Sequence, residues 1–134
     1  MIRLNDSDST YIDEGVAGFA KRMTEDGILA RQVDLLLLGF AYAVQRELTP
    51  PTKIKRHDLL RVVALDQDTR LAVESTAHWY ARKIGEGELP DAKALLEFIC
   101  RVGSAGVAAL QQEWKDRAKS QIEMQILRLA QPTS

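Results

Sequence analysis

Glu74 and His78 are the residues whose types and spacing come nearest to a catalytic or metal-binding arrangement. They stand four positions apart in a segment with helical periodicity, and residues at this spacing share one helix face. They could act as an acid and a base, or as two metal ligands. A metal site or a catalytic triad requires a third group, and the other histidine, His57, belongs to a different segment. We therefore interpret the pair as an exposed helix feature without a chemical role.

Cys100 is the only cysteine, and it could be a nucleophile only if its surroundings lowered the thiol pKa. It stands in an apolar stretch between Ile99 and Arg101, where Arg101 alone could stabilise a thiolate. A cysteine in such a stretch is more often a small buried apolar side chain. The chain also lacks the spaced histidines and cysteines of a zinc site, and its glycine-rich stretches do not follow a predicted strand. We therefore expect a protein that is not an enzyme and that uses neither metal nor cofactor.

Four basic residues lie close together in the middle of the chain and could bind phosphate groups. They are Lys53, Lys55, Arg56 and Arg61. The segment from Thr52 to His57 is expected to be a surface loop, and Asp58 is expected to cap a short helix from Leu59 to Leu65. Cations on a loop before a helix are a common way to contact a nucleic-acid backbone. The alternative is a solvated loop whose charges only keep the protein soluble.

The overall charge gives no general attraction to nucleic acid or to a membrane surface. The 134 residues include 18 basic and 19 acidic side chains, so any such binding has to come from a local patch. Hydrophobic residues make up 46% of the chain, which is enough for one globular domain spanning residues 1–134. A single cysteine excludes an internal disulfide, and the first residues lack the apolar stretch of a secretory signal. We therefore expect a cytoplasmic protein.

The segment from Ala30 to Leu48 is apolar on nearly every side of a predicted helix instead of along one stripe. Four consecutive leucines, Leu35 to Leu38, are followed by Phe40 and further apolar residues. A helix with this pattern belongs inside a protein. Its apolar run is shorter than the ~20 residues needed to cross a bilayer. We therefore predict a buried central helix over about residues 30–47, and no membrane insertion.

The rest of the chain also shows helical periodicity and predicts an all-α protein. Apolar residues recur at helical spacing from Ile12 to Met23 and from Val73 to Ile84, and Pro90 and Asp91 begin a further apolar helix. The small residues from Gly103 to Gly106 are either a break in that helix or a place where another element packs closely. We expect a compact bundle of five or six helices around the central one.

A long C-terminal helix is predicted from Val107 to Leu129, where apolar residues recur every three or four positions. Such a helix is longer than the core of a 134-residue chain can easily cover. We therefore expect its apolar stripe to contact a second copy of the chain or a larger protein. The residues of this predicted interface are Trp114, Ala118, Ile122, Ile126 and Leu129.

Three segments resemble a family of small helical proteins that accompany Dnd clusters, the DNA-phosphorothioation modification and restriction systems of bacteria. The matching segments are Val33–Ala43 (VDLLLLGFAYA), Leu59–Leu65 and Phe98–Leu110 (FICRVGSAGVAAL). The order of elements is also similar, with an apolar helix, a basic loop containing prolines and a glycine-interrupted helix. The resemblance covers the chain from about Thr24 to Trp114. It implies an accessory role in bacterial antiviral defence, without an enzyme active site.

Two functional classes lead the interpretation of the sequence. The first is a non-enzymatic helical accessory protein, a small subunit that docks on a larger subunit of a bacterial DNA-targeting modification or restriction system, or on itself. The second is a protein that contacts DNA or RNA through the basic residues of segment 53–61. An enzyme that uses Glu74, His78 and Cys100 comes third, because these residues form no recognisable catalytic group.

Overall fold

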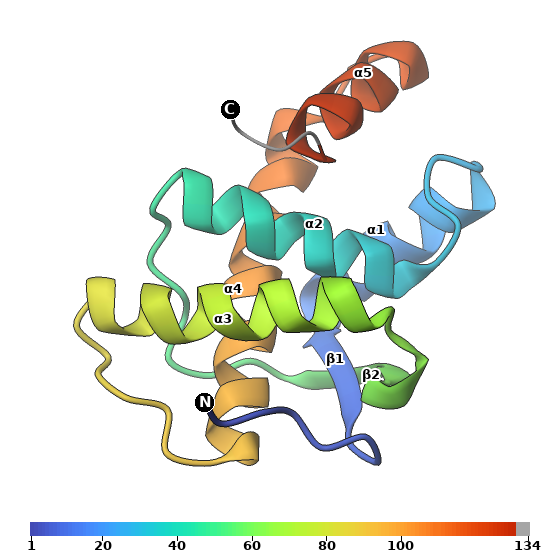
Figure 1. The fold of residues 1–134 in the computed structure, drawn as a ribbon. Coiled ribbons are helices and arrows are strands. Elements are labelled where there is room, and N and C mark those ends of the chain that lie inside the picture. Colours follow the sequence, from blue (N-terminus) through green and yellow to red (C-terminus); the bar gives the residue numbers. More distant parts are fainter. Residues whose placement is uncertain (131–134) are drawn as a thin grey trace.

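The computed structural model describes residues 1–130, and most of them are helical (Figure 1). The elements in this part of the chain are β1 (Ser9–Asp13), α1 (Glu14–Glu25), α2 (Gln32–Gln45), β2 (Arg56–Arg61), a 3-10 turn (Val62–Ala64), α3 (Gln67–Lys83), α4 (Ala92–Glu113) and α5 (Lys119–Ala130). The predicted predominance of helix is confirmed. The chain is not strictly all-α, however, because β1 and β2 form a small antiparallel sheet.

α2 lies at the centre of the core, where it crosses α4 (Figure 1). It also packs on α1, on α5 and on both strands. Its buried side chains are Val33, Leu35, Leu36, Phe40, Tyr42 and Ala43. The predicted central helix is confirmed for this face, whereas Leu37 and Leu38 are only half-buried. Apolar residues on every side of a helix therefore did not mean burial on every side.

Glycines let α2 and α4 approach each other until their backbones are nearly in contact. A methyl group added at Gly106 of α4 would lie 1.7 Å from the carbonyl oxygen of Gly39 in α2. One added at Gly39 would lie 2.5 Å from the carbonyl oxygen of Gly103. Gly103 and Gly106 both lie inside the continuous helix α4. The small-residue stretch is thus a packing point and not a break.

The strand pairing makes two sequence predictions wrong. Ile12 belongs to β1 and not to the first helix, and Leu59 belongs to β2 and not to a helix capped by Asp58. In the sheet, Tyr11 lies opposite Asp58, and the register shifts between Ser9 and Tyr11. The two strands are more than 40 residues apart in the sequence, so no local pattern reveals their pairing. β1 also packs on α4, which buries Ile12 completely.

Local sequence signals lie at several helix boundaries. The side chains of Asp13, Asp66 and Asp91 cap α1, α3 and α4 by accepting hydrogen bonds from backbone N–H groups of the first turns. α3 is followed by Gly85 and Gly87, whose φ angles of 81° and 85° lie in the left-handed region that ends a helix. The predicted end of this helix is confirmed, although α3 begins earlier than predicted.

The continuous helix predicted from Val107 to Leu129 is wrong, because the chain turns after α4. α4 ends at Glu113, and Asp116 has a φ of 65°, a left-handed conformation that interrupts a helix. α5 then begins at Lys119 and lies at one end of the molecule, beyond α2 (Figure 1). The predicted interface residues are therefore divided between the turn and a separate short helix.

α4 is the one helix in the described part of the chain that is long and apolar enough to cross a membrane. About three fifths of its most apolar window, 61%, is buried inside the fold. The core helix of a protein that never enters a membrane meets the same two criteria of length and composition.

Candidate binding surfaces

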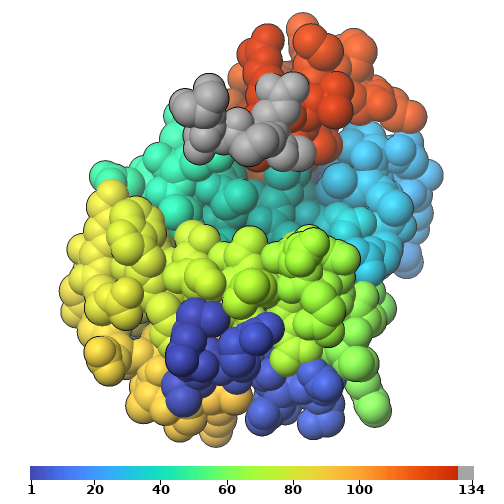
Figure 2. Space-filling model, viewed as in Figure 1, coloured from blue at the N-terminus to red at the C-terminus, as the bar shows by residue number. Residues whose placement is uncertain are grey.

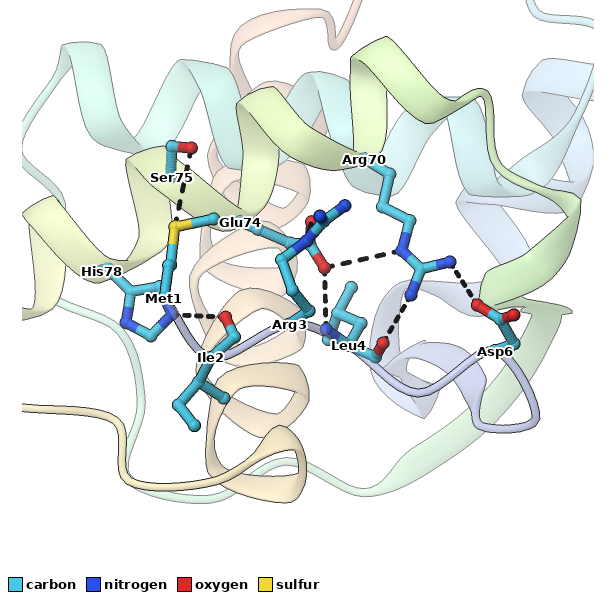
Figure 3. Close-up of polar contacts among 9 residues, drawn as sticks. All are labelled: Met1, Ile2, Arg3, Leu4, Asp6, Arg70, Glu74, Ser75 and His78. Carbon is cyan, nitrogen blue, oxygen red and sulfur yellow. Dashed lines mark hydrogen bonds and ion pairs between the residues drawn. The ribbon is translucent and has the colours of Figure 1, made fainter.

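Glu74 lies at the centre of a polar network that joins α3 to the N-terminal residues (Figure 3). Its carboxylate is fully buried and accepts hydrogen bonds from Arg3 Nε at 2.5 Å and from the backbone N–H of Leu4 at 2.7 Å. Arg70 Nε lies 3.5 Å from the same carboxylate, and its other nitrogens donate to Asp6 and to the Leu4 carbonyl oxygen. Glu74 is therefore a buried structural anion whose oxygens already have partners, and its predicted exposure is wrong.

His78 contacts the N-terminal segment and has no hydrogen bond with Glu74 among residues 1–130. Its Nε2 lies 2.9 Å from the carbonyl oxygen of Ile2. The space-filling view shows the N-terminal residues, in blue, lying across α3 (Figure 2). Glu74 and His78 thus both fasten this segment to the helix. Within the described residues no three histidine, cysteine or acidic side chains come together in a way that could hold a metal ion.

Cys100 is fully buried, and this burial raises the pKa of its thiol to about 12. The thiol is therefore protonated at neutral pH and is a poor nucleophile. The neighbouring guanidinium of Arg101 is bound elsewhere, since its Nη2 lies 2.6 Å from Glu86 and its Nη1 donates to the carbonyl oxygen of Pro51 at 3.0 Å. The structure agrees with the interpretation of Cys100 as a buried apolar side chain.

Two of the four predicted phosphate-binding cations have carboxylate partners. Lys55 Nζ lies 3.2 Å from Glu14, and Arg56 Nε lies 2.5 Å from Asp58. The guanidinium of Arg56 also covers the ring of Tyr11, 4.4 Å from its centre. The other two cations have no carboxylate within 4 Å among residues 1–130. The segment is thus less positive than its sequence indicated.

Lys53 and Arg56 share a shallow hollow of about 220 Å³ with a cation from α4. The lining residues are Tyr11, Lys53, Ile54, Arg56, Glu97 and Arg101. Its charge is largely balanced, because Arg56 and Arg101 have acidic partners outside the hollow and Glu97 lines it. Arg61 is absent from this lining and lies at the other end of β2, opposite Ser9. The four cations therefore do not converge on one phosphate site.

Two of the predicted interface residues belong to the core of the chain itself. Trp114 is 3% exposed and packs against Phe19, with 6.1 Å between the ring centres; Ile122 is 6% exposed. Ile126 and Leu129 are half-buried, and Ala118 is exposed. The helix α5 instead exposes Met124 and Leu127, with 55% and 61% of their surface accessible. Neither residue was predicted, because both lie off the apolar stripe of helical spacing in the sequence.

A polar cluster holds α5 against the ends of α2 and α4. The carboxylate of Glu113 accepts a hydrogen bond from the Tyr42 hydroxyl at 2.5 Å and another from Gln125 Nε2 at 3.1 Å. Gln125 Oε1 in turn accepts from Trp114 Nε1 at 2.9 Å and from Arg117 at 2.8 Å. The Tyr42 hydrogen bond is the main reason that the pKa of Glu113 lies below its ordinary value. This carboxylate is therefore ionised at neutral pH, and both of its oxygens accept hydrogen bonds.

A hollow of about 810 Å³ lies beside this cluster, between the end of α2 and the helix α5. We call it the arginine hollow. Its lining residues are Gln45, Arg46, Glu113, Arg117, Gln121, Met124, Gln125, Arg128 and Leu129. Three arginines thus face a single carboxylate. These residues come from three elements that only the fold brings together, and Leu129 is the one among them that was predicted as an interface residue.

No known protein family, no characterised protein and no solved structure matches this chain.

Proposed function

We propose that the protein is a non-enzymatic helical interaction module that binds a larger protein subunit, or a second copy of itself, through α5. The observation that carries this proposal is the exposure of Met124 and Leu127 on a helix whose other apolar face already packs on the protein's own core. The two residues are three positions apart and thus neighbours on the helix surface.

The location and energetics of α5 fit this role. The helix lies at one end of the molecule (Figure 1). Complete burial of a Met or Leu side chain contributes roughly 1.5–3 kcal/mol. Burial of Met124 and Leu127 together would thus supply a small apolar centre for an interface, next to the polar side chains of the arginine hollow.

The resemblance to Dnd-associated proteins supplies the biological setting of the proposal. It makes the partner a larger subunit of a bacterial modification or restriction system that targets DNA, with this protein as an accessory in the cytoplasm. The buried thiol of Cys100 and the structural role of Glu74 support the non-enzymatic part, because they remove two of the three catalytic candidates.

Nucleic-acid contact through segment 53–61 is the second candidate function. Lys53 and Arg61 favour it, because they have no carboxylate within 4 Å among the described residues. Two phosphate contacts imply a slope of about -1.8 for log affinity against log salt on duplex DNA. Fluorescence anisotropy with labelled duplex and single strand over a range of salt concentrations measures this slope.

Copurification from the native host tests the leading proposal. A Met124→Glu/Leu127→Glu variant should lose the partner that the wild-type protein retains, with an unchanged melting temperature, because both side chains are exposed. Leu71→Glu is the matched control, since Leu71 is 46% exposed on α3, away from α5. Light scattering separates a larger partner from a second copy. Retention of every partner by the double variant would contradict the proposal.

A further inference from the structure

We infer that the arginine hollow receives an acidic segment of the protein partner, in which carboxylate side chains alternate with apolar ones. This inference rests on the proposed function and adds the chemistry that α5 recognises. It is carried by the charges and apolar groups that line the hollow.

Among the described residues, the hollow holds an excess of positive charge, with three arginines and one carboxylate in its lining. Arg46 and Arg128 have no carboxylate within 4 Å among residues 1–130, and Arg117 lies 3.6 Å from Glu113. Glu113 carries one negative charge and therefore cannot neutralise three guanidinium groups. Arginine binds carboxylates through two parallel hydrogen bonds, so the guanidinium groups of Arg46 and Arg128 suit an acidic ligand.

Helix ends explain only part of this arrangement. Arg46 is the C-terminal cap of α2, Arg117 follows the end of α4, and Arg128 lies in the last turn of α5. A cation at each of these places is favourable, because the C-terminal end of a helix carries partial negative charge. That effect does not require three arginines to line the same hollow, where their charges repel one another and one carboxylate is present.

Apolar side chains beside the arginines favour a peptide over a free anion. Met124 and Leu129 line the hollow, and Leu127 adjoins Met124 on the exposed side of α5. The volume of about 810 Å³ is sufficient for several side chains of an extended segment. A ligand with alternating acidic and apolar residues could pair with the guanidinium groups and cover the exposed Met and Leu together.

Nucleic acid fits the hollow less well, although it is also an anion. Binding to single strands depends on exposed aromatic rings that stack on the bases. The aromatic residues next to the hollow are Trp114 and Tyr42, and both are buried, with 3% and 7% of their surface exposed. The exposed Trp79 lies on α3 and is absent from this lining.

A labelled short peptide of alternating glutamate and leucine is the probe, and its glutamine and leucine analogue is the uncharged comparison. Fluorescence anisotropy should show saturable binding of the acidic peptide and roughly tenfold weaker binding of the analogue. Arg128→Gln and Arg46→Gln should each lower the affinity for the acidic peptide by about tenfold, because each removes one charge-assisted pair. Arg82→Gln is the matched control, since Arg82 is an exposed arginine on α3 without a carboxylate partner among the described residues.

Three results would overturn the inference. The first is equal binding of the acidic peptide and its uncharged analogue, and the second is unchanged affinity in both arginine variants. The third is tighter binding of a single-stranded oligonucleotide that depends on the same arginines. Thermal melts test whether the variants fold. If Arg46→Gln disturbs α2, Arg46→Lys is the second variant, because it retains the positive charge over the Tyr42 ring; it should keep most of the affinity for the acidic peptide.

Copurification of the same variants separates this inference from the proposed function. If the native partner is lost by Met124→Glu/Leu127→Glu but retained by the arginine variants, α5 is an interface and its acidic ligand is refuted. If all of these variants retain the partner, both proposals fail.

Discussion

Replacing Gly106 by alanine would test whether the core depends on direct backbone contact between α2 and α4. The new methyl carbon would lie 1.7 Å from the carbonyl oxygen of Gly39 and 2.4 Å from its carbonyl carbon. Real Cβ atoms essentially never approach another heavy atom closer than 3.0 Å. The two helices would therefore have to separate by roughly 1.3 Å, the difference between 3.0 and 1.7 Å, in an interior that has no free space.

The expected magnitude follows from two opposing effects. Alanine is favoured over glycine in a helix by about 1 kcal/mol. Inserting a methyl group into a packed core typically costs 1–3 kcal/mol, and a gap of about 1 Å between packed surfaces loses a quarter to a half of their attraction. The obstacle at Gly106 is the backbone of a buried helix, which cannot rotate away as a side chain can. We therefore take the upper end of that cost and expect a net loss of about 2 kcal/mol.

Urea unfolding followed by far-ultraviolet circular dichroism measures this change. Gly18→Ala in α1 is the matched control, because its methyl group would meet only Arg22 Nη1, at the ordinary distance of 3.6 Å. The control should gain up to about 1 kcal/mol from helix propensity alone. A Gly106→Ala protein as stable as the wild type, or as the control, would refute the close-contact reasoning.

Three further predictions concern side chains that are buried or hydrogen-bonded. Cys100 should react with a thiol reagent only at the rate of global unfolding, because the side chain is fully buried and its thiol pKa is about 12; rapid labelling of the folded protein would contradict its assigned position. Glu74→Gln should lower the free energy of unfolding by about 3 kcal/mol in urea, at the lower end of the cost of breaking a buried ion pair, because it removes the buried carboxylate that pairs with Arg3 and Arg70 while Arg70 keeps Asp6; the exposed Glu97→Gln should change it little. The pKa of Glu113 is lowered in the folded state, so its ionised form stabilises the protein above the ordinary value of 4.5, and this contribution is lost as pH falls below it. The stability difference between the wild type and Glu113→Gln should therefore shrink as the pH falls below 4.5. A difference that stays constant on acidification would refute the stabilising role of the ionised, hydrogen-bonded carboxylate.

Local signals in the sequence determined the predominance of helix and several of the helix ends. Asp66 and Asp91 cap helices through hydrogen bonds to residues only three positions away. Gly85 and Gly87 end α3, because glycine adopts a positive φ at little cost. The apolar segment around Leu35 and Leu36 identified the central helix, because apolar residues of this density must be removed from water.

Tertiary structure decided the features that depend on contacts between distant residues. Ile12 has helical spacing with later apolar residues, yet its segment pairs with β2, whose hydrogen-bonding groups no local pattern reveals. The turn at Asp116 separates α5 from α4, although apolar spacing continues across it, because Trp114 and Ile122 fold back onto the core.

The candidate site belongs to the same category. Arg46 and Arg128 are more than 80 residues apart, and each alone is an ordinary cation near the end of a helix. Conversely, Lys55 belongs to a basic cluster in the sequence but lies beside Glu14 in the fold. Sequence spacing fixes which side chains share a helix face, whereas the electrostatic environment of a charge depends on neighbours that only the folded chain brings within a few ångströms.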